Sequence, residues 1–449
     1  MYKFIPERLK KLANSMDKPL YAVGGVCRDF LAGLVSEHDW DICAPVRAEE
    51  FSAAAEACGF TVTSVYKNTG TVNLKADGVE YEYTCFRTDR YVRGKHSPEE
   101  IYFTEDIASD ARRRDFKCNA VYYDIAAQKF VDPLGGIEDI KNGTLSTVDD
   151  ASKVFGEDGL RLMRLCRIAA QTGFLPSGEC MDGALKNCAL IADIAPERIW
   201  KELADILTAD RKYGVKNAQY LGLKYLFGCG VLSLILPELA LGDKMYQRAD
   251  FHDHDVLEHS LRCVMYAPCD LTLRTAALLH DIGKPYCKIN FGKYARHEEE
   301  GERIAADVLK RLRAPKRFAS RVCRLVALHM YDLSGQASEN KVRKFIVNNL
   351  DAFDDLLIIK QADYSACKDD LSECPCVKKW ESIYKKMVYE GVPLTLKALA
   401  VKGDELIASG ICADETAKTL KFLLGECAIG NVPNDKGRLI SYALARRGG

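Results

Sequence analysis

Long uninterrupted runs of apolar residues are absent from the sequence. The longest ones, such as the stretch around Leu278, fall well short of the roughly 20 residues that cross a bilayer, and they contain charges. The residues after Met1 show amphipathic leucine and lysine spacing in place of the apolar core of a secretory signal. These absences argue against a membrane anchor and predict a cytoplasmic protein.

An excess of charge of either sign is also absent. The chain has 63 Lys and Arg against 64 Asp and Glu, a net charge of −1, so contact with nucleic acid requires local basic surface. Arg112 to Arg114 and Arg161 to Arg167 are such stretches. The 18 cysteines lack the compact spacing of a disulfide framework, and we expect reduced thiols. Cys374 and Cys376, with Cys367 upstream, form one tight group that lacks the second pair of a tetrahedral zinc site.

The length of 449 residues predicts several domains, because one hydrophobic core seldom organises so long a chain. From Tyr21 to about Asp132, short β-rich segments alternate with helices, which indicates an α/β head. Past Phe155, helical periodicity dominates, as in Leu160 to Gly173 and Arg198 to Leu207. We expect a multidomain α+β fold with a head (1–140), an all-helical neck (141–245), a helical body (246–385) and a helical tail (386–449).

The first candidate site follows a glycine pair. Gly24 and Gly25 come directly after a short apolar strand and before a helical stretch, where backbone amides can approach phosphate oxygens. Ten residues beyond Asp29 lies Asp39-Trp-Asp41. Residues two apart on a strand share a face, so the two carboxylates are expected side by side. A third carboxylate lies in Val79-Glu-Tyr-Glu-Tyr-Thr84, where Glu80 and Glu82 share a face and the residues alone do not choose between them.

Two adjacent carboxylates repel unless a cation lies between them, and their hard oxygens suit Mg²⁺. A solvated acidic turn would explain an isolated Asp-x-Asp, but the glycine pair and Arg28 upstream favour the metal. Such a cluster fits phosphoryl or nucleotidyl transfer, in which two metals activate a hydroxyl and stabilise the leaving pyrophosphate.

The motifs resemble those of one family in their order along the chain. Gly24-Gly-Val-Cys-Arg-Asp29, followed by Asp39-Trp-Asp41, is similar to the signature of class II tRNA nucleotidyltransferases and bacterial poly(A) polymerases. Further matching segments follow, namely Asn68 to Val72, Glu82 to Arg87, Asp110 to Ala120, Asp132 to Gly136, Glu157 to Arg161 and Glu197 to Ile199. The resemblance implies a nucleotidyltransferase head with a small mixed or antiparallel sheet. It also implies catalytic Asp39, Asp41 and Glu82 with Mg²⁺, and tRNA, ATP and CTP as partners.

Asp158 and Arg161 lie three apart on a predicted helix and would share one face. An Asp acceptor beside an Arg donor complements cytosine and adenine and opposes the carbonyl of uracil and guanine. An ordinary helix-stabilising pair explains the spacing equally well. The resemblance implies that the two read the incoming base, and that the nucleotide is also contacted by Gly25, Arg28, Arg114, Arg164 and Arg167.

A polar stretch from Thr88 to Thr104 is expected as a mobile loop beside this site. In the resembled family such a loop helps to switch from cytidine to adenine addition, which favours a complete CCA-adding enzyme. The sequence lacks the basic Phe-Arg-Leu motif of the poly(A) branch, and this absence favours tRNA as the substrate.

A second candidate site lies in the helical body. His259, His280-Asp281 and Asp363 match the ligand order of the HD phosphohydrolase superfamily, and such ligands suit Mg²⁺ or a transition metal such as Mn, Ni or Fe. His297 and His329 could complete a second metal position. The resemblance implies a phosphatase or cyclic phosphodiesterase that acts on damaged RNA ends. His252 and His254, just upstream, are expected at the rim or as surface histidines.

Three functions therefore follow from the sequence. The principal hypothesis is CCA addition to tRNA, with a helical tail that grips the RNA. The first alternative is a poly(A) polymerase. The second is an HD phosphohydrolase with an inert head.

Overall fold

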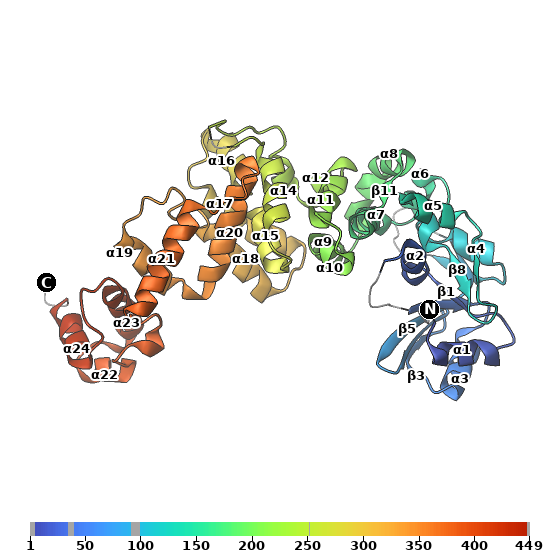
Figure 1. Cartoon of the computed structure of the whole chain (residues 1–449), viewed down its shortest axis with the longest axis horizontal. Helices are drawn as coiled ribbons and strands as arrows, with labels where there is room; N and C mark the ends of the chain where they lie inside the picture. Colours follow the sequence, from blue (N-terminus) through green and yellow to red (C-terminus); the bar gives the residue numbers. More distant parts are fainter. Residues whose placement is uncertain (1–4, 35–39, 91–98, 251, 447–449) are drawn as a thin grey trace. The chain divides into compact units, whose positions relative to one another are not determined.

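The computed structural model describes residues 5–34, 40–90, 99–250 and 252–446. The chain divides into two compact units, one formed by Met1–Ala240 with Lys310–Ala314 and the other by Leu241–Leu309 with Pro315–Gly449. Every strand of the described residues belongs to the first unit (Figure 1). This confirms the predicted multidomain α+β fold.

The head is built on one mixed sheet of seven strands in the order β3-β4-β5-β2-β1-β8-β9. Only β2 and β5 run parallel; every other neighbouring pair in this sheet is antiparallel. The strands are β1 Tyr21–Val23, β2 Trp40–Ala44, β3 Thr61–Tyr66, β4 Thr71–Ala76, β5 Val79–Cys85, β8 Tyr122–Asp124 and β9 Lys129–Val131. The small mixed sheet that the resemblance implied is therefore present.

Buried and exposed side chains alternate along β5, so one face of the strand packs into the core and the other face carries the acidic residues. Tyr81, Tyr83 and Cys85 are buried, while Glu80 and Glu82 on the opposite face are exposed. The ring of Tyr83 stacks on Phe51, in the helix Ala48–Ala57, at a centroid distance of 3.5 Å. The head helices are α1 Glu7–Ser15, α2 Gly25–Ala32, α3 Ala48–Ala57, α4 Ile107–Arg112 and α5 Gly136–Asn142.

The polar stretch from Thr88 to Thr104, predicted as a loop, is partly ordered as a strand pair. Its ends belong to β6 Arg87–Arg90 and β7 Glu100–Phe103, which form an antiparallel ladder. Residues 91–98 lie outside the described residues.

The neck is helical, with one short strand pair that the sequence did not predict. Its helices are α6 Ala151–Glu157, α7 Leu160–Thr172, α8 Gly178–Asn187, α9 Pro196–Leu207, α10 Asp210–Tyr213, α11 Ala218–Gly228, α12 Val231–Ile235 and α13 Pro237–Ala240. The parallel pair consists of β10 Thr144–Leu145 and β11 Leu175–Pro176. Helix α7 packs against α9 and α11, and nearly all of its residues are buried. It therefore offers a rigid base for the arginines that it carries.

The long regular elements in the described part of the second unit are helices. They are α14 Val256–Tyr266, α15 Leu271–Leu279, α16 Gly283–Phe291, α17 His297–Arg311, α18 Lys316–Leu328, α19 Glu339–Asn348, α20 Leu350–Lys368, α21 Pro375–Tyr389, α22 Gly403–Ala408, α23 Ala413–Ala428 and α24 Lys436–Ala445. Helices α14 and α20 pack against each other, as do α15 and α18. Among the described residues, no helix combines the length and apolar character needed to cross a membrane.

Candidate functional sites

The carboxylates of the first site meet across the parallel strand pair. Asp41 of β2 lies directly opposite Glu82 of β5, and both line one cavity. Glu80, which the sequence could not separate from Glu82, instead pairs with Lys75, whose Nζ lies 2.6 Å from its Oε1. The register of β2 against β5 thus selects Glu82. Asp39, predicted as the partner of Asp41, lies outside the described residues.

Because Gly24 has no side chain, the carboxylate of Asp41 can lie directly beside it. Its φ of 80° and ψ of −140° are rare for residues with a side chain, and a Cβ at this position would lie 2.8 Å from Oδ2 of Asp41. Gly25 then begins α2, as the strand–glycine–helix pattern predicts. The glycine pair therefore turns the chain and keeps the neighbouring carboxylate exposed to the cavity. Two carboxylates held beside a glycine cradle form a donor set that suits Mg²⁺.

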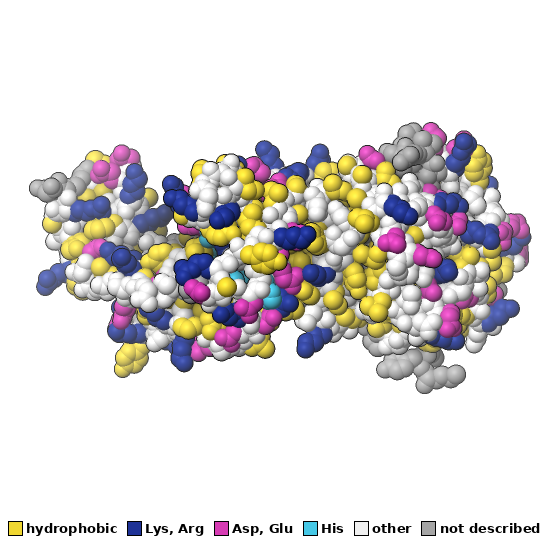
Figure 2. Space-filling model, turned by 90° about the horizontal axis from the view of Figure 1, so that it is seen from above, with side chains coloured by type: hydrophobic (Ala, Val, Ile, Leu, Met, Phe, Trp, Pro, Cys, Tyr) yellow, Lys and Arg dark blue, Asp and Glu magenta, His cyan; other side chains and the backbone are white. Residues whose placement is uncertain are grey.

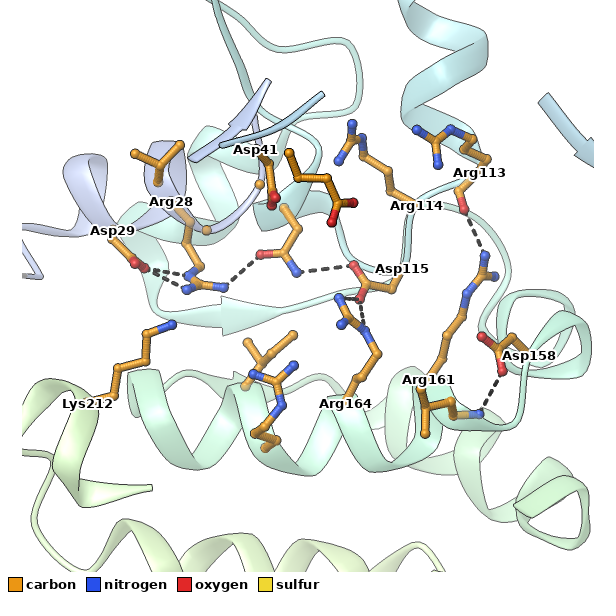
Figure 3. Close-up of a pocket in the computed structure, with 18 of the residues that line it drawn as sticks. Arg28, Asp29, Asp41, Arg113, Arg114, Asp115, Asp158, Arg161, Arg164 and Lys212 are labelled. Carbon is orange, nitrogen blue, oxygen red and sulfur yellow. Dashed lines mark hydrogen bonds and ion pairs between the residues drawn. The ribbon is translucent and has the colours of Figure 1, made fainter. Parts of the chain in front are cut away.

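The cavity has a volume of about 630 Å³, which suits a nucleotide-sized ligand. Nine arginine and lysine side chains line it, against five carboxylates. Figure 3 shows Asp41 on one side, with arginines of α7 rising from the opposite side. A chain with nearly no net charge thus has a locally basic cavity, of the kind that attracts a polyphosphate.

A buried chain of polar contacts joins the two sides of the cavity. Arg28 donates to Oδ1 of Asp29 at 2.7 Å and to Oδ1 of Asn119 at 2.8 Å. Asn119 donates to Asp115 at 3.1 Å, and Asp115 pairs with Arg164 at 2.6 Å (Figure 3). Burial alone would raise the pKa of Asp115, but Arg164 and Asn119 hold it below its usual range. Arg28 lines the cavity as predicted, yet its guanidinium is largely engaged within the protein.

Asp110 anchors the neighbouring arginines. Its fully buried carboxylate accepts hydrogen bonds from Nε of Arg113 at 2.7 Å, from Arg114 at 3.2 Å and from the hydroxyl of Tyr122 at 2.7 Å. Burial opposes its ionisation, but the two guanidinium groups lower the pKa of Asp110 to about 2. Arg113 and Arg114 are therefore held in place at the wall of the cavity.

Asp158 does not lie on a helix with Arg161, and the predicted helical pair is wrong. Asp158 follows the end of α6 in extended conformation, and its Oδ1 accepts the backbone N–H of Leu160 at 2.9 Å. The helix ends at Asp158 itself, with φ −148° and ψ 111°, and Gly159 after it packs tightly: a Cβ there would lie 2.5 Å from the carbonyl oxygen of Leu190. Asp158 and Arg161 nevertheless line the same cavity.

Arg161 is 5% exposed and is fixed by three contacts. Its guanidinium donates to the carbonyls of Val154 and Arg113, each at 2.8 Å, and to Glu157 at 2.7 Å. Arg167, one turn beyond Arg164, lines the cavity and pairs with Glu202 at 2.7 Å.

Arg198 and Lys212 also line the cavity, and the sequence assigned no role to either. Arg198 follows Glu197 in one of the matching segments, so a signal for it existed. Lys212 lies on the four-residue helix α10 and points toward Arg28 and Asp29 in Figure 3. No local pattern marks it, because only the packing of the neck brings it there.

The second site gathers all six predicted side chains in the second unit. Nε2 of His259 lies 3.0 Å from Asp363 and 3.2 Å from Nε2 of His280. The two carboxylate oxygens of Asp281 contact different histidines. Its Oδ2 lies 3.2 Å from Nε2 of His280, and its Oδ1 lies 3.1 Å from Nε2 of His297. Nε2 of His329 completes the second side, 3.4 Å from that of His297. We call His259, His280, Asp281, His297, His329 and Asp363 the HD cluster.

Three histidines of the HD cluster are oriented by backbone carbonyls. Nδ1 of His280 lies 2.7 Å from the oxygen of Ala277, and the same i−3 contact holds Nδ1 of His297 at 2.9 Å and of His329 at 2.7 Å. A protonated Nδ1 leaves Nε2 with its lone pair directed at the cluster, as in metal-binding histidines. Two overlapping ligand groups result, His259 with His280 and Asp281, and Asp281 with His297 and His329.

Comparisons with known proteins give two family matches and several relatives. The family model for the poly A polymerase head domain matches residues 20–146, and that for the HD domain matches residues 256–365. A multifunctional CCA protein of Chromobacterium violaceum is 34% identical over 317 residues, which cover 66% of this chain and 70% of the relative. An A-adding tRNA nucleotidyltransferase of Deinococcus radiodurans is 28% identical over 362 residues, covering 77% and 76%.

The fold has counterparts among solved structures. The CCA-adding enzyme of Bacillus stearothermophilus, in complex with CTP, is similar with a TM-score of 0.70 at 21% identity. The match covers 100% of this chain and 98% of that one.

Proposed function

Since this chain belongs to the family of CCA-adding tRNA nucleotidyltransferases, we propose that it builds or repairs the 3′ CCA end of tRNA from CTP and ATP. The observation that supports this most strongly is the placement of Asp41 and Glu82 side by side at a cavity lined with arginines. No nucleic-acid template is needed if the protein itself reads the base.

The carboxylates of Asp41 and Glu82, with Asp39, would hold Mg²⁺. When bound, this metal would activate the terminal hydroxyl of the RNA and stabilise the leaving pyrophosphate. Arg113 and Arg114 would bind the triphosphate, because Asp110 holds both guanidinium groups at the cavity wall.

On the other side of the cavity, Arg164 and Arg167 extend from α7, and Asp158 with Arg161 would choose the base. The Asp158 carboxylate accepts from the exocyclic amine of cytosine or adenine, and Arg161 donates to the adjoining ring nitrogen. Gly25 and Arg28 would complete the nucleotide site. Arg28 would act chiefly by holding Asp29 and Asn119 in position.

The direct test is Asp41→Ala with a tRNA that lacks its last three nucleotides. We expect incorporation of CMP and AMP to fall by more than about 10³-fold, because a metal site supplies several kcal/mol of transition-state stabilisation. Binding of tRNA should remain, because we assign Asp41 to metal binding and assign RNA binding to the tail. Glu80→Gln is the matched control, because Glu80 lies on the same strand face but pairs with Lys75. Retained incorporation by Asp41→Ala would rule out the site.

The same assay separates the alternatives within the family. A complete enzyme adds CCA when both nucleotides are supplied and adds a single A to tRNA ending in CC. Long adenylate tails from ATP alone would identify a poly(A) polymerase. Extension only of tRNA ending in CC would identify an A-adding enzyme like the Deinococcus radiodurans relative.

A second function is favoured by the HD cluster, in which Asp281 belongs to two ligand groups. We propose that these groups bind Mn²⁺, Ni²⁺, Mg²⁺ or Fe²⁺ and that the cluster hydrolyses phosphate esters at RNA 3′ ends. His280 and His297 would hold the ions with Asp281 between them. The test is hydrolysis of an RNA with a 2′,3′-cyclic phosphate by wild type, by Asp281→Asn and by Asp41→Ala. Only Asp281→Asn should lose activity; equal activity in all three would refute the assignment.

The tail from 386 to 449 would bind tRNA through its backbone and shape, as suits a protein that accepts every tRNA. Binding should weaken as salt rises. We place the activity in the cytoplasm, where reducing conditions keep thiols reduced, and none of the 18 cysteines, all of which are described residues, forms a disulfide.

A further inference from the structure

A thiol lies against the HD cluster and takes no part in it. His252, His259 and Cys367 offer ligand atoms that all lie within 4.8 Å of one another. Cys367 belongs to the end of α20, and its carbonyl accepts the backbone N–H of Asp253 at 3.0 Å. This contact holds the segment of His252 against α20. We call His252, His259 and Cys367 the rim site.

His259 differs from the other histidines of the HD cluster. Its Nε2 faces the cluster, 3.0 Å from Asp363, but its Nδ1 is buried without a hydrogen-bond partner. Nδ1 of His280 and of its two companions is instead held by a backbone carbonyl. The side chain of His259 is fully buried, and a buried ring nitrogen without a partner is costly. Nδ1 of His252 also lacks a partner, and the rings of the two histidines lie edge to face, 5.0 Å apart.

We propose that the rim site binds a thiophilic divalent ion, of which Zn²⁺ is the type, through Nδ1 of His259, His252 and the Cys367 thiolate. Binding forms one metal–sulfur bond and two metal–nitrogen bonds, and the thiol proton passes to solvent. Ligands of one tetrahedral zinc lie about 3.5 Å apart, so modest side-chain rotations bring these three atoms into place. A thiolate favours Zn²⁺ over the hard Mg²⁺.

The rim site is more accessible than the HD cluster. His252 and Cys367 are half-buried, whereas the HD cluster behind them is almost fully buried. Figure 2 shows a few histidine side chains at the surface, among acidic, basic and hydrophobic side chains. Cys374 and Cys376, the thiols that the sequence grouped with Cys367, do not belong to the rim site; the thiol of Cys376 instead donates to the carbonyl of Asp332 at 3.0 Å.

The two sites compete for His259. A neutral imidazole binds a metal through one nitrogen and keeps a proton on the other. An ion on Nδ1 therefore places an N–H on Nε2, directed at the HD cluster, which then loses one of its ligands. Zn²⁺ at the rim site is thus an inhibitor of the HD cluster, a consequence that rests on the hydrolase function proposed above.

The test uses the full-length chain, freed of metal by chelation, kept in a thiol-free reductant and titrated with Co²⁺. Wild type should develop the near-ultraviolet absorption of thiolate-to-cobalt charge transfer, and Zn²⁺ should abolish it. Cys367→Ser should lose this band, while Cys374→Ser should keep it. His252→Ala, which removes no hydrogen bond from Nδ1, should bind Zn²⁺ at least about 100-fold more weakly, since even an outer-shell partner contributes 10–100-fold.

A band that is missing from wild type, or that survives in Cys367→Ser, overturns the rim site. Thermal unfolding of each variant verifies that it is folded before its spectrum is compared. The hydrolase assay is a separate readout: Zn²⁺ should inhibit wild type, and Cys367→Ser should need at least about tenfold more Zn²⁺ for the same inhibition. Absence of any hydrolysis would refute the hydrolase function and leave the cobalt result intact.

Discussion

Replacing Gly24 with alanine tests whether the turn before α2 sets the position of the Asp41 carboxylate, to which we assign a metal. The backbone at Gly24, with φ 80° and ψ −140°, costs a residue with a side chain about 1–3 kcal/mol. The new Cβ would also lie 2.8 Å from Oδ2 of Asp41, so the carboxylate must move. Misplacement of a reacting group by about 1 Å costs ~10²-fold in rate, or about 2.7 kcal/mol.

Gly33→Ala is the matched control at the other end of α2. Gly33 also has a positive φ, 68°, but an added Cβ would meet nothing within 4 Å. Its backbone cost is about 1–2 kcal/mol, without effect on Asp41. The assay measures kcat and KM for CTP on tRNA lacking its last three nucleotides, with urea unfolding in parallel. We expect kcat to fall about 100-fold in Gly24→Ala and to stay within about threefold of wild type in Gly33→Ala. A normal kcat in folded Gly24→Ala, or an equal loss in both variants, would refute the reasoning.

Three further outcomes follow from the same cavity. Asp158→Ala should raise misincorporation of UMP and GMP about tenfold or more, because one hydrogen-bonding partner of the base is lost; unchanged fidelity in sequenced products would exclude this role. Lys212→Met should raise KM for CTP and ATP about tenfold, the value of a charge-assisted contact, and an unchanged KM would remove Lys212 from nucleotide binding. The pKa of Asp110 is lowered to about 2, so its contribution to stability is present above about pH 4 and is lost as pH falls toward 2. The difference in Tm between wild type and Asp110→Asn should therefore shrink over that range, and a constant difference would contradict the ion pairing.

Local patterns predicted the parts of the site that depend on neighbours in sequence. The strand, glycine and helix around Gly24 follow from an apolar run and a residue that tolerates positive φ. Alternation placed Glu80 and Glu82 on one face, but it could not choose between them. That choice depends on the pairing of β5 with β2, a contact between segments about 40 residues apart, and on Lys75 of β4.

Other features required the tertiary fold. The helix predicted through Asp158 ignored Gly159, which is a recognisable break signal, and the sequence could not show that the carbonyl of Leu190 leaves no room for a side chain there. Lys212 reaches the cavity only because the neck packs beside the head within the first unit. In the HD cluster the ligand residues were visible in the sequence, but the orphaned Nδ1 of His259 was not, because rotamer and burial decide it.

The Arg161 side chain is held rigidly, and such rigidity is what a protein needs if it is to select a base without a nucleic-acid template. Rejection of a wrong base requires that the site cannot relax around it, and Arg161 is held by Glu157 and two backbone carbonyls. Asp158 is likewise tied to the N–H of Leu160. In the proposed function this fixed pair would oppose uracil and guanine, whereas cytosine and adenine would present it with the same acceptor and amine. The order C, C, A must therefore be set outside the pair. The segment from Thr88 to Thr104 is the nearest candidate, because Arg87, which begins β6 beside it, already lines the cavity.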